Sequence, residues 1–152
     1  MQIKIIPLVA LFIVLIMSLY VIFNPSYQKS IEAKYYYETG DYKEALTLAN
    51  EAFNLDIYNR MASTIKAQSL IALNYRSYNN DAKNYMAQLN ALAKHQTLSD
   101  ADKAKIKLIC EIMIARYKKL SSSIVTEKKL IQESANYYKN FEKLLEKVTS
   151  EI

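Results

Sequence analysis

The chain has 152 residues, with 20 basic and 15 acidic side chains and a formal net charge of +5. One glycine and two prolines are too few for the turns of a β-sandwich or an α/β fold, so the composition predicts an all-α protein. A single cysteine excludes an internal disulfide, and the small positive charge does not by itself indicate a nucleic-acid partner.

An uncharged, apolar segment occupies residues 5–23. As a helix it would be roughly 28 Å long, close to the thickness of the hydrocarbon core of a bilayer. It is longer than the apolar region of a signal peptide, and no small-x-small cleavage site follows it. We therefore expect an N-terminal transmembrane signal-anchor over residues 1–25 and a helical domain over residues 26–152. Cleavage of the segment, or its burial as a core helix, are the alternatives.

The flanks of the apolar segment predict its orientation. A short N-terminal tail with Lys4 and the α-amino group is expected to stay in the cytoplasm, because basic residues are retained on that side. None of the asparagines lies in an N-x-[ST] sequon, which fits a bacterial envelope protein. The expected location is the bacterial inner membrane, crossed once, with the C-terminal domain in the periplasm.

Six helices are expected after the anchor, in three hairpins at about residues 27–55, 59–95 and 99–149. Gly40 is placed to end the first helix, and Asp41 to begin the second as its N-cap, with Glu44 completing a capping box.

Two further signals divide the rest of this region. The polar stretch 74–80 (NYRSYNN) predicts a loop inside the second hairpin, and Ser99 or Asp100 predicts the start of the fifth helix. Residues 121–123, all serine, predict the turn before the last helix.

Small and aromatic residues recur in residues 33–56 (AKYYYETGDYKEALTLANEAFNLD) at Ala33, Tyr36, Ala45 and Ala52, around the turn that begins at Gly40. This pattern resembles the tetratricopeptide (TPR) repeat, a 34-residue helix hairpin. A second copy is predicted because Ala67 and Leu70 follow Ala33 and Tyr36 by 34 residues. The resemblance implies an N-terminal transmembrane helix followed by a TPR-like α-solenoid of about three helix hairpins.

The resemblance also implies a binding surface. In TPR-like domains the first helix of each hairpin lines a concave groove that takes up a segment of a partner. The residues of this chain at those positions are Lys34, Tyr37, Glu38, Thr64, Gln68 and Ile71.

The expected fifth helix is apolar on two sides. One stripe holds Ala104, Leu108, Ile112 and Ala115, and the other Ile106, Ile109, Met113, Tyr117 and Leu120. A helix that is apolar around most of its circumference is expected to be buried between neighbours.

The expected last helix, residues 124–148, carries a heptad-like stripe that includes Ile131, Tyr138, Phe141 and Leu145. Either this stripe packs on the preceding helix and closes the solenoid, or it pairs with another chain as a short coiled coil, giving a homo- or hetero-oligomer.

Chemistry is sparse in the sequence. The only histidine, His95, is expected at a helix end; Asp100 and Asp102 suit a helix start, and Cys110 suits a buried position. No catalytic, cofactor-binding or metal-binding motif occurs, so we expect no enzyme activity, cofactor or metal.

The sequence therefore predicts a non-enzymatic, membrane-anchored periplasmic TPR-like scaffold or adaptor. The resemblance to small membrane-tethered TPR proteins implies partners that are protein subunits of a large bacterial envelope assembly, most of all a flagellar motor. The apolar segment at residues 5–23 implies the membrane as a further partner. Alternatives are an accessory protein of type IV pili, competence or secretion with DNA contact, and a membrane-tethered periplasmic chaperone.

Overall fold

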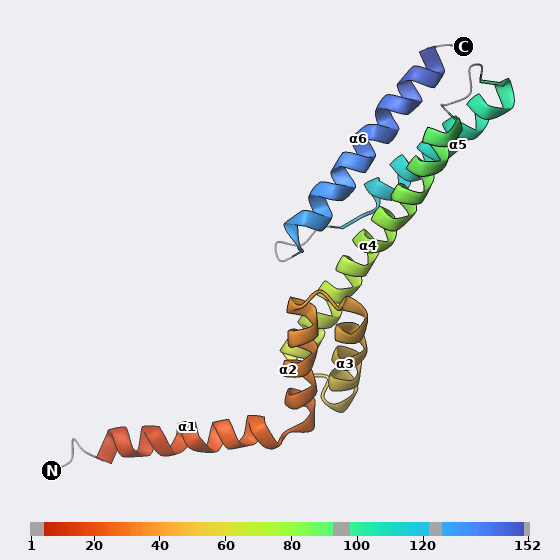
Figure 1. Ribbon diagram of the computed structural model, residues 1–152. Coiled ribbons are helices and arrows are strands. Elements are labelled where there is room, and N and C mark those ends of the chain that lie inside the picture. Colours follow the sequence, from red (N-terminus) through yellow and green to blue (C-terminus); the bar gives the residue numbers. More distant parts are fainter. Residues whose placement is uncertain (1–4, 93–97, 122–125, 151–152) are drawn as a thin grey trace. The chain divides into compact units, whose positions relative to one another are not determined.

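A computed structural model describes residues 5–92, 98–121 and 126–150 (Figure 1). Every regular element in these ranges is an α-helix, which confirms the all-α fold class. The helices are α1 (Ile5–Phe23), α2 (Pro25–Glu38), α3 (Tyr42–Leu55), α4 (Arg60–Leu92), α5 (Asp100–Lys118) and α6 (Lys128–Ser150).

The chain forms two compact units, Met1–Leu70 (the N-terminal unit) and Ile71–Ile152 (the C-terminal unit). The division falls within α4. The boundary expected from the sequence, between residues 1–25 and 26–152, separates an anchor from a domain and stays a prediction.

The α2–α3 hairpin forms at the turn that its sequence predicts, and of the expected capping box the structure describes only the bond accepted by Asp41. Gly40 adopts φ +85°, a conformation that residues with a Cβ rarely take, and its N–H donates to the Tyr37 carbonyl at 3.1 Å. The N–H of Asp41 donates to the Tyr36 carbonyl at 2.8 Å, which completes a Schellman cap. The Asp41 carboxylate then accepts from the Glu44 N–H and starts α3. The two residues that predicted this turn, Gly40 and Asp41, are themselves part of it.

Alanines make the core of the N-terminal unit. Ala33, Ala45 and Ala49 are wholly buried, and Leu48 and Ile65 complete the cluster. Because an alanine side chain is one methyl group, helices that meet through it can approach closely. Figure 1 shows α2 and α3 side by side along their length.

The predicted loop at residues 74–80 is wrong, because α4 runs through it as one helix of 33 residues. Tyr75, Tyr78 and Asn79 are buried there, at the spacing of one helix face. The Asn79 amide donates to the Leu130 carbonyl at 3.2 Å and accepts from Ser134 Oγ. A side chain that would suit a solvated loop, Asn79, is thus held by α6, and the expected hairpin at 59–95 does not form.

The expected second repeat is wrong in register as well. Ala67 and Leu70, which were to occupy the buried small and aromatic positions, are exposed. The buried residues of this stretch are instead Ile65 and Ser69. The 34-residue spacing therefore matches residues that do not share an environment.

Large side chains make the core of the C-terminal unit, between the end of α4, α5 and α6. Its buried members include Tyr78, Leu89, Ile109, Met113 and Phe141. Ser99 begins α5 with a full capping box, in which its hydroxyl and the Asp102 carboxylate each accept from the other residue's backbone N–H. The predicted serine turn at residues 121–123 lies mostly outside the described residues.

Candidate functional site

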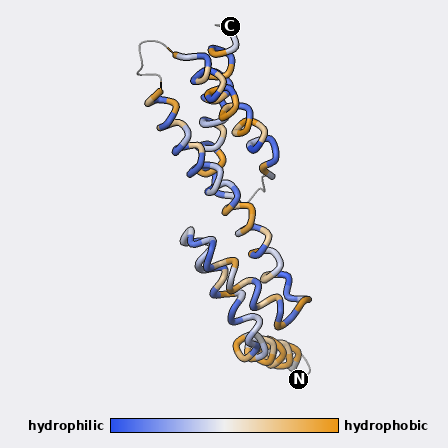
Figure 2. The backbone as a smooth tube through the Cα atoms, turned by 90° about the vertical axis from the view of Figure 1, so that its right-hand side faces the viewer, coloured by the Kyte–Doolittle hydropathy of each residue, from blue (hydrophilic) through white to orange (hydrophobic). Residues whose placement is uncertain are grey.

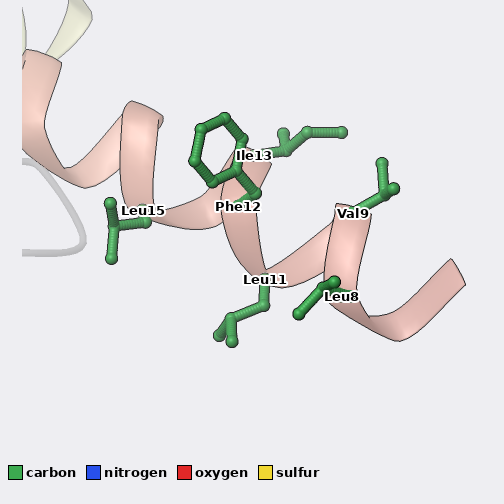
Figure 3. A pocket seen from close by; sticks show the side chains of 6 residues that line it. All are labelled: Leu8, Val9, Leu11, Phe12, Ile13 and Leu15. Atoms are coloured by element: carbon green, nitrogen blue, oxygen red, sulfur yellow. The ribbon is translucent and has the colours of Figure 1, made fainter. Parts of the chain in front are cut away.

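An uncovered apolar helix is the first candidate surface. All side chains from Ile6 to Tyr20 are exposed, and Figure 2 shows α1 as hydrophobic along its course, where the other helices mix both colours. A shallow hollow on it is lined by Leu8, Val9, Leu11, Phe12, Ile13 and Leu15. Figure 3 shows that these side chains come from one helix and point in different directions, so the hollow is part of the helix surface and encloses no ligand site.

The length of α1 is close to the limit for a membrane span. Among the described residues, no single helix is both long and apolar enough to cross a bilayer by length and composition. Ile6–Tyr20 and Pro25–Glu38 meet the criterion together, as a pair bent at the break between them.

The predicted groove residues on α2 are open to solvent or partly so. Lys34 and Glu38 are exposed and form an ion pair at 3.6 Å, one helical turn apart. Tyr37 is half-buried, and its ring lies 5.4 Å from that of Tyr42, between centroids. This part of α2 therefore offers one aromatic side chain and an ion pair in which both charges are largely solvated.

The other three groove residues lie on α4. Thr64 is exposed, whereas Gln68 and Ile71 are half-buried. Thr64, Gln68 and Ile71 share one side of the helix by their spacing, but the boundary between the two units separates Ile71 from the others. The six predicted groove residues therefore lie in two separate sets of three, one on α2 and the other on α4.

The predicted partner-binding stripe of α6 faces inward. Phe141 is wholly buried, so it is a core residue and offers no surface to a partner. Leu145 packs partly buried against the same core, and Ile131 is half-buried. The Tyr138 ring stacks on that of Tyr117, with centroids 4.4 Å apart. Of the two alternatives for this stripe, packing on the preceding helix is the one that the described contacts support.

Hydrogen bonding shapes the acid–base chemistry of Tyr138. Its hydroxyl donates to the Glu142 carboxylate, and this bond to the neutral phenol raises the pKa of Tyr138 above its ordinary value. The Tyr138 hydroxyl thus serves as a hydrogen-bond donor within α6.

An exposed apolar stripe on α5 is the surface that sequence reasoning missed. Leu108 and Ile112 are 57% and 46% exposed, although they were expected to be buried. With the exposed alanines of the same side they form the α5 outer face: Ala101, Ala104, Leu108, Ile112 and Ala115. The other stripe, which includes Ile109 and Met113, meets the core together with Cys110 and Ile114.

Charged residues flank the α5 outer face. Lys105, Lys107 and Glu111 are exposed beside it, and this solvated rim is the signal that could have identified the face. At the helix end, Arg116 forms an ion pair with Asp81 of α4 at 2.8 Å. An apolar stripe with a rim of both signs suits a partner helix that is itself amphipathic.

The described residues offer little else for chemistry. Burial raises the pKa of the Cys110 thiol to about 11, which keeps it un-ionised and poorly nucleophilic. Among the described residues, no group of three or more His, Cys, Asp or Glu side chains is placed to hold a metal ion. His95 lies outside the described residues.

Comparison of the chain with protein families, with curated proteins and with solved structures finds no match.

Proposed function

We propose that this protein is a non-enzymatic, membrane-tethered adaptor that holds partner proteins at a membrane surface. The observation that carries the proposal is α1, whose described side chains are exposed and apolar on all sides and which contains no charge. A soluble protein rarely exposes so large a contiguous apolar surface, because the hydrophobic effect drives such surface out of water. A bilayer supplies apolar surroundings for such a surface.

The dimensions of α1 are compatible with this role. Its 19 residues are close to the ~20 that span the hydrocarbon core. A bilayer accommodates a slightly short helix by thinning locally, at a cost of a fraction of a kcal/mol per Å. Lys4 at one flank and Asn24 at the other would then lie in the headgroup layers.

Partner binding is assigned to the α5 outer face. Leu108 and Ile112 at its centre are large and exposed, and the alanines around them would let the backbone of a partner helix approach closely. The groove of the predicted TPR-like solenoid is a weaker candidate, because the second hairpin does not form. In the α2–α3 hairpin, three alanines on which the TPR resemblance rests, Ala33, Ala45 and Ala52, are buried.

For the cellular setting, we retain the proposal drawn from the sequence. The chain would cross the bacterial inner membrane once, with the helical units in the periplasm, as a scaffold subunit of a large envelope assembly. A flagellar motor is the first assembly to test. A pilus, competence or secretion accessory with DNA contact, or a tethered chaperone, are the alternatives. Salt-sensitive DNA binding would favour the first of these, and heterogeneous transient clients would favour the second.

Two matched pairs of substitutions test the tether. Ile13→Lys with Ile16→Lys places two charges at the centre of α1, where each costs about 2.5–3.5 kcal/mol on insertion scales. Ile6→Lys with Ile22→Lys places the same charges near its ends, where lysine reaches the headgroups. The proposal predicts that the central pair releases the protein from washed membranes and that the terminal pair does not. Equal retention of both variants would contradict membrane insertion of α1.

A further inference from the structure

The turn between α3 and α4 exposes three apolar side chains within four residues. Leu55, Ile57 and Tyr58 are 55%, 60% and 85% exposed. Neither turn chemistry nor helix capping requires apolar residues there, since Asp56 already fixes the turn by accepting from the Tyr58 N–H at 2.9 Å. The three side chains form the apolar turn, residues 55–58.

Buried hydrogen bonds hold the apolar turn against the first residues of α2. Ser26 Oγ donates to the Ala52 carbonyl at 2.8 Å, near the end of α3. The Asn59 side-chain amide donates to Ser26 Oγ at 2.8 Å and to Ser30 Oγ at 3.2 Å. Its carbonyl accepts from the Ala62 N–H at 3.1 Å, at the start of α4. Asn59, Ser26 and Ser30 are buried, so these bonds are shielded from competition by water.

Chain connectivity then places the apolar turn beside the end of α1. The first residue of α2 is Pro25, and Asn24 alone separates it from α1. Figure 1 shows the start of α2 and the end of α3 at the same end of the hairpin, next to the junction with α1. This proximity does not depend on the direction in which α1 leaves the junction.

The chemistry of the apolar turn suits the boundary between lipid headgroups and acyl chains. Tyrosine is enriched there because its ring is apolar and its hydroxyl can remain hydrated. Leu55 and Ile57 supply aliphatic surface, and the exposed Arg60 next to the turn can meet a lipid phosphate.

We propose that the apolar turn is a second membrane contact, which dips into the interface of the bilayer that holds α1. The inference rests on the proposed function, because it needs α1 in that bilayer. It also has a consequence for mechanism. Two membrane contacts, α1 across the bilayer and the apolar turn at its interface, would fix the orientation of the α2–α3 hairpin relative to the membrane. A partner would then bind a protein whose α2–α3 hairpin has a defined orientation relative to the membrane.

The test uses fluorescence, since the chain contains no tryptophan. Three full-length variants each carry one tryptophan at an exposed tyrosine: Tyr20→Trp in α1, Tyr58→Trp in the apolar turn and Tyr35→Trp on α2. Tyr35 lies about 15 Å along the helix axis from Pro25 and serves as the control. Each variant is reconstituted into phosphatidylcholine–phosphatidylglycerol vesicles, with and without bromine on the acyl chains, which quenches tryptophan only at close range.

The proposal predicts that brominated lipid lowers the emission of the Tyr58→Trp variant about twofold, and leaves that of Tyr35→Trp unchanged. Quenching of Tyr20→Trp with none of Tyr58→Trp would overturn the inference and leave the tether standing. Absence of quenching at all three positions would overturn both.

Two other results would also overturn the inference. Equal quenching at positions 58 and 35 would mean that the whole hairpin lies on the lipid. Blue-shifted but unquenched emission from position 58 would mean that a second copy or another protein covers the turn.

Discussion

The N-terminal unit packs its helices through alanines, whereas the C-terminal unit packs them through large side chains. Ala33, Ala45 and Ala49 are wholly buried in the first core. Tyr78, Met113 and Phe141 are buried in the second. An alanine core depends on close backbone approach and therefore fails when a side chain is enlarged. A core of large residues depends on the volume they fill and therefore fails when one is removed.

The two units also differ in how they use buried polar groups. In the N-terminal unit, Ser26, Ser30 and Asn59 join the start of α2 to the start of α4. In the C-terminal unit, Asn79 joins the middle of α4 to α6 through Leu130 and Ser134. In each unit a buried asparagine fixes the register of α4 against another helix, which apolar contacts alone would leave less defined.

The largest effect is expected from removing a large core side chain. Phe141→Ala should lower the free energy of unfolding by about 3–5 kcal/mol, because it leaves a cavity that the neighbours only partly fill. Urea unfolding of the full chain in detergent, followed by circular dichroism, measures the change. Ile112→Ala, on the α5 outer face, is the control and should cost far less. If the two variants unfold alike, the assignment of core and outer face is wrong.

Enlarging an alanine distinguishes the N-terminal unit. Ala45→Leu should lower the free energy of unfolding by about 1–3 kcal/mol, because α2 and α3 pack too closely at this position to accommodate the larger side chain. Ala67→Leu is the matched control at an exposed position of α4 and should change stability by less than about 0.5 kcal/mol. If Ala45→Leu and Ala67→Leu lowered the free energy of unfolding equally, the result would instead support the second TPR-like repeat, in which Ala67 is buried.

Removing the buried Asn79 amide of the C-terminal unit should lower the free energy of unfolding by less than the Phe141→Ala substitution does. Asn79→Ala leaves the Leu130 carbonyl and the Ser134 hydroxyl with fewer partners, at about 1–3 kcal/mol. Asn80→Ala, at the neighbouring exposed position, should be neutral or slightly stabilising, because alanine favours the helix. The same urea series measures both. A neutral Asn79→Ala would indicate that residues 74–80 form the loop predicted from the sequence.

The smallest expected effect is on the pH dependence of the free energy of unfolding. Burial raises the pKa of Cys110 to about 11 from an ordinary value of 9.0. As the pH rises above 9, the unfolded chain loses the thiol proton before the folded chain does, so the free energy of unfolding falls. Wild type should lose on the order of 1 kcal/mol more than Cys110→Ala between pH 9 and pH 11. Parallel losses in the two proteins would show that the thiol is not buried when folded.

The features predicted correctly are those whose signals are local. Gly40, Asp41 and Ser99 act on backbone groups within a few residues of themselves, so the ends of α2, α3 and α5 follow from short stretches of sequence. The apolar segment 5–23 coincides with α1 for the same reason.

The features predicted wrongly depend on partners far along the chain. Tyr75, Tyr78 and Asn79 look like loop residues, because nothing nearby reveals that α6 binds Asn79 more than 50 positions later. Periodicity showed that α5 has two apolar stripes, but which of them meets a neighbour depends on where α4 and α6 lie. Within α5 itself, only the charged residues beside the outer face, such as Lys105 and Glu111, indicate which side is exposed.

The most direct test of the proposed adaptor is native purification of the tagged full chain from gently solubilised membranes, with the stoichiometry of every co-purifying protein measured. Leu108→Glu disrupts the α5 outer face, and Leu70→Glu makes the same change at an exposed position of the N-terminal unit. We expect wild type and Leu70→Glu to retain the same subunits of one assembly in a fixed ratio, and Leu108→Glu to lose them. Recovery of the protein alone, or with scattered substoichiometric proteins that Leu108→Glu does not affect, would contradict the account.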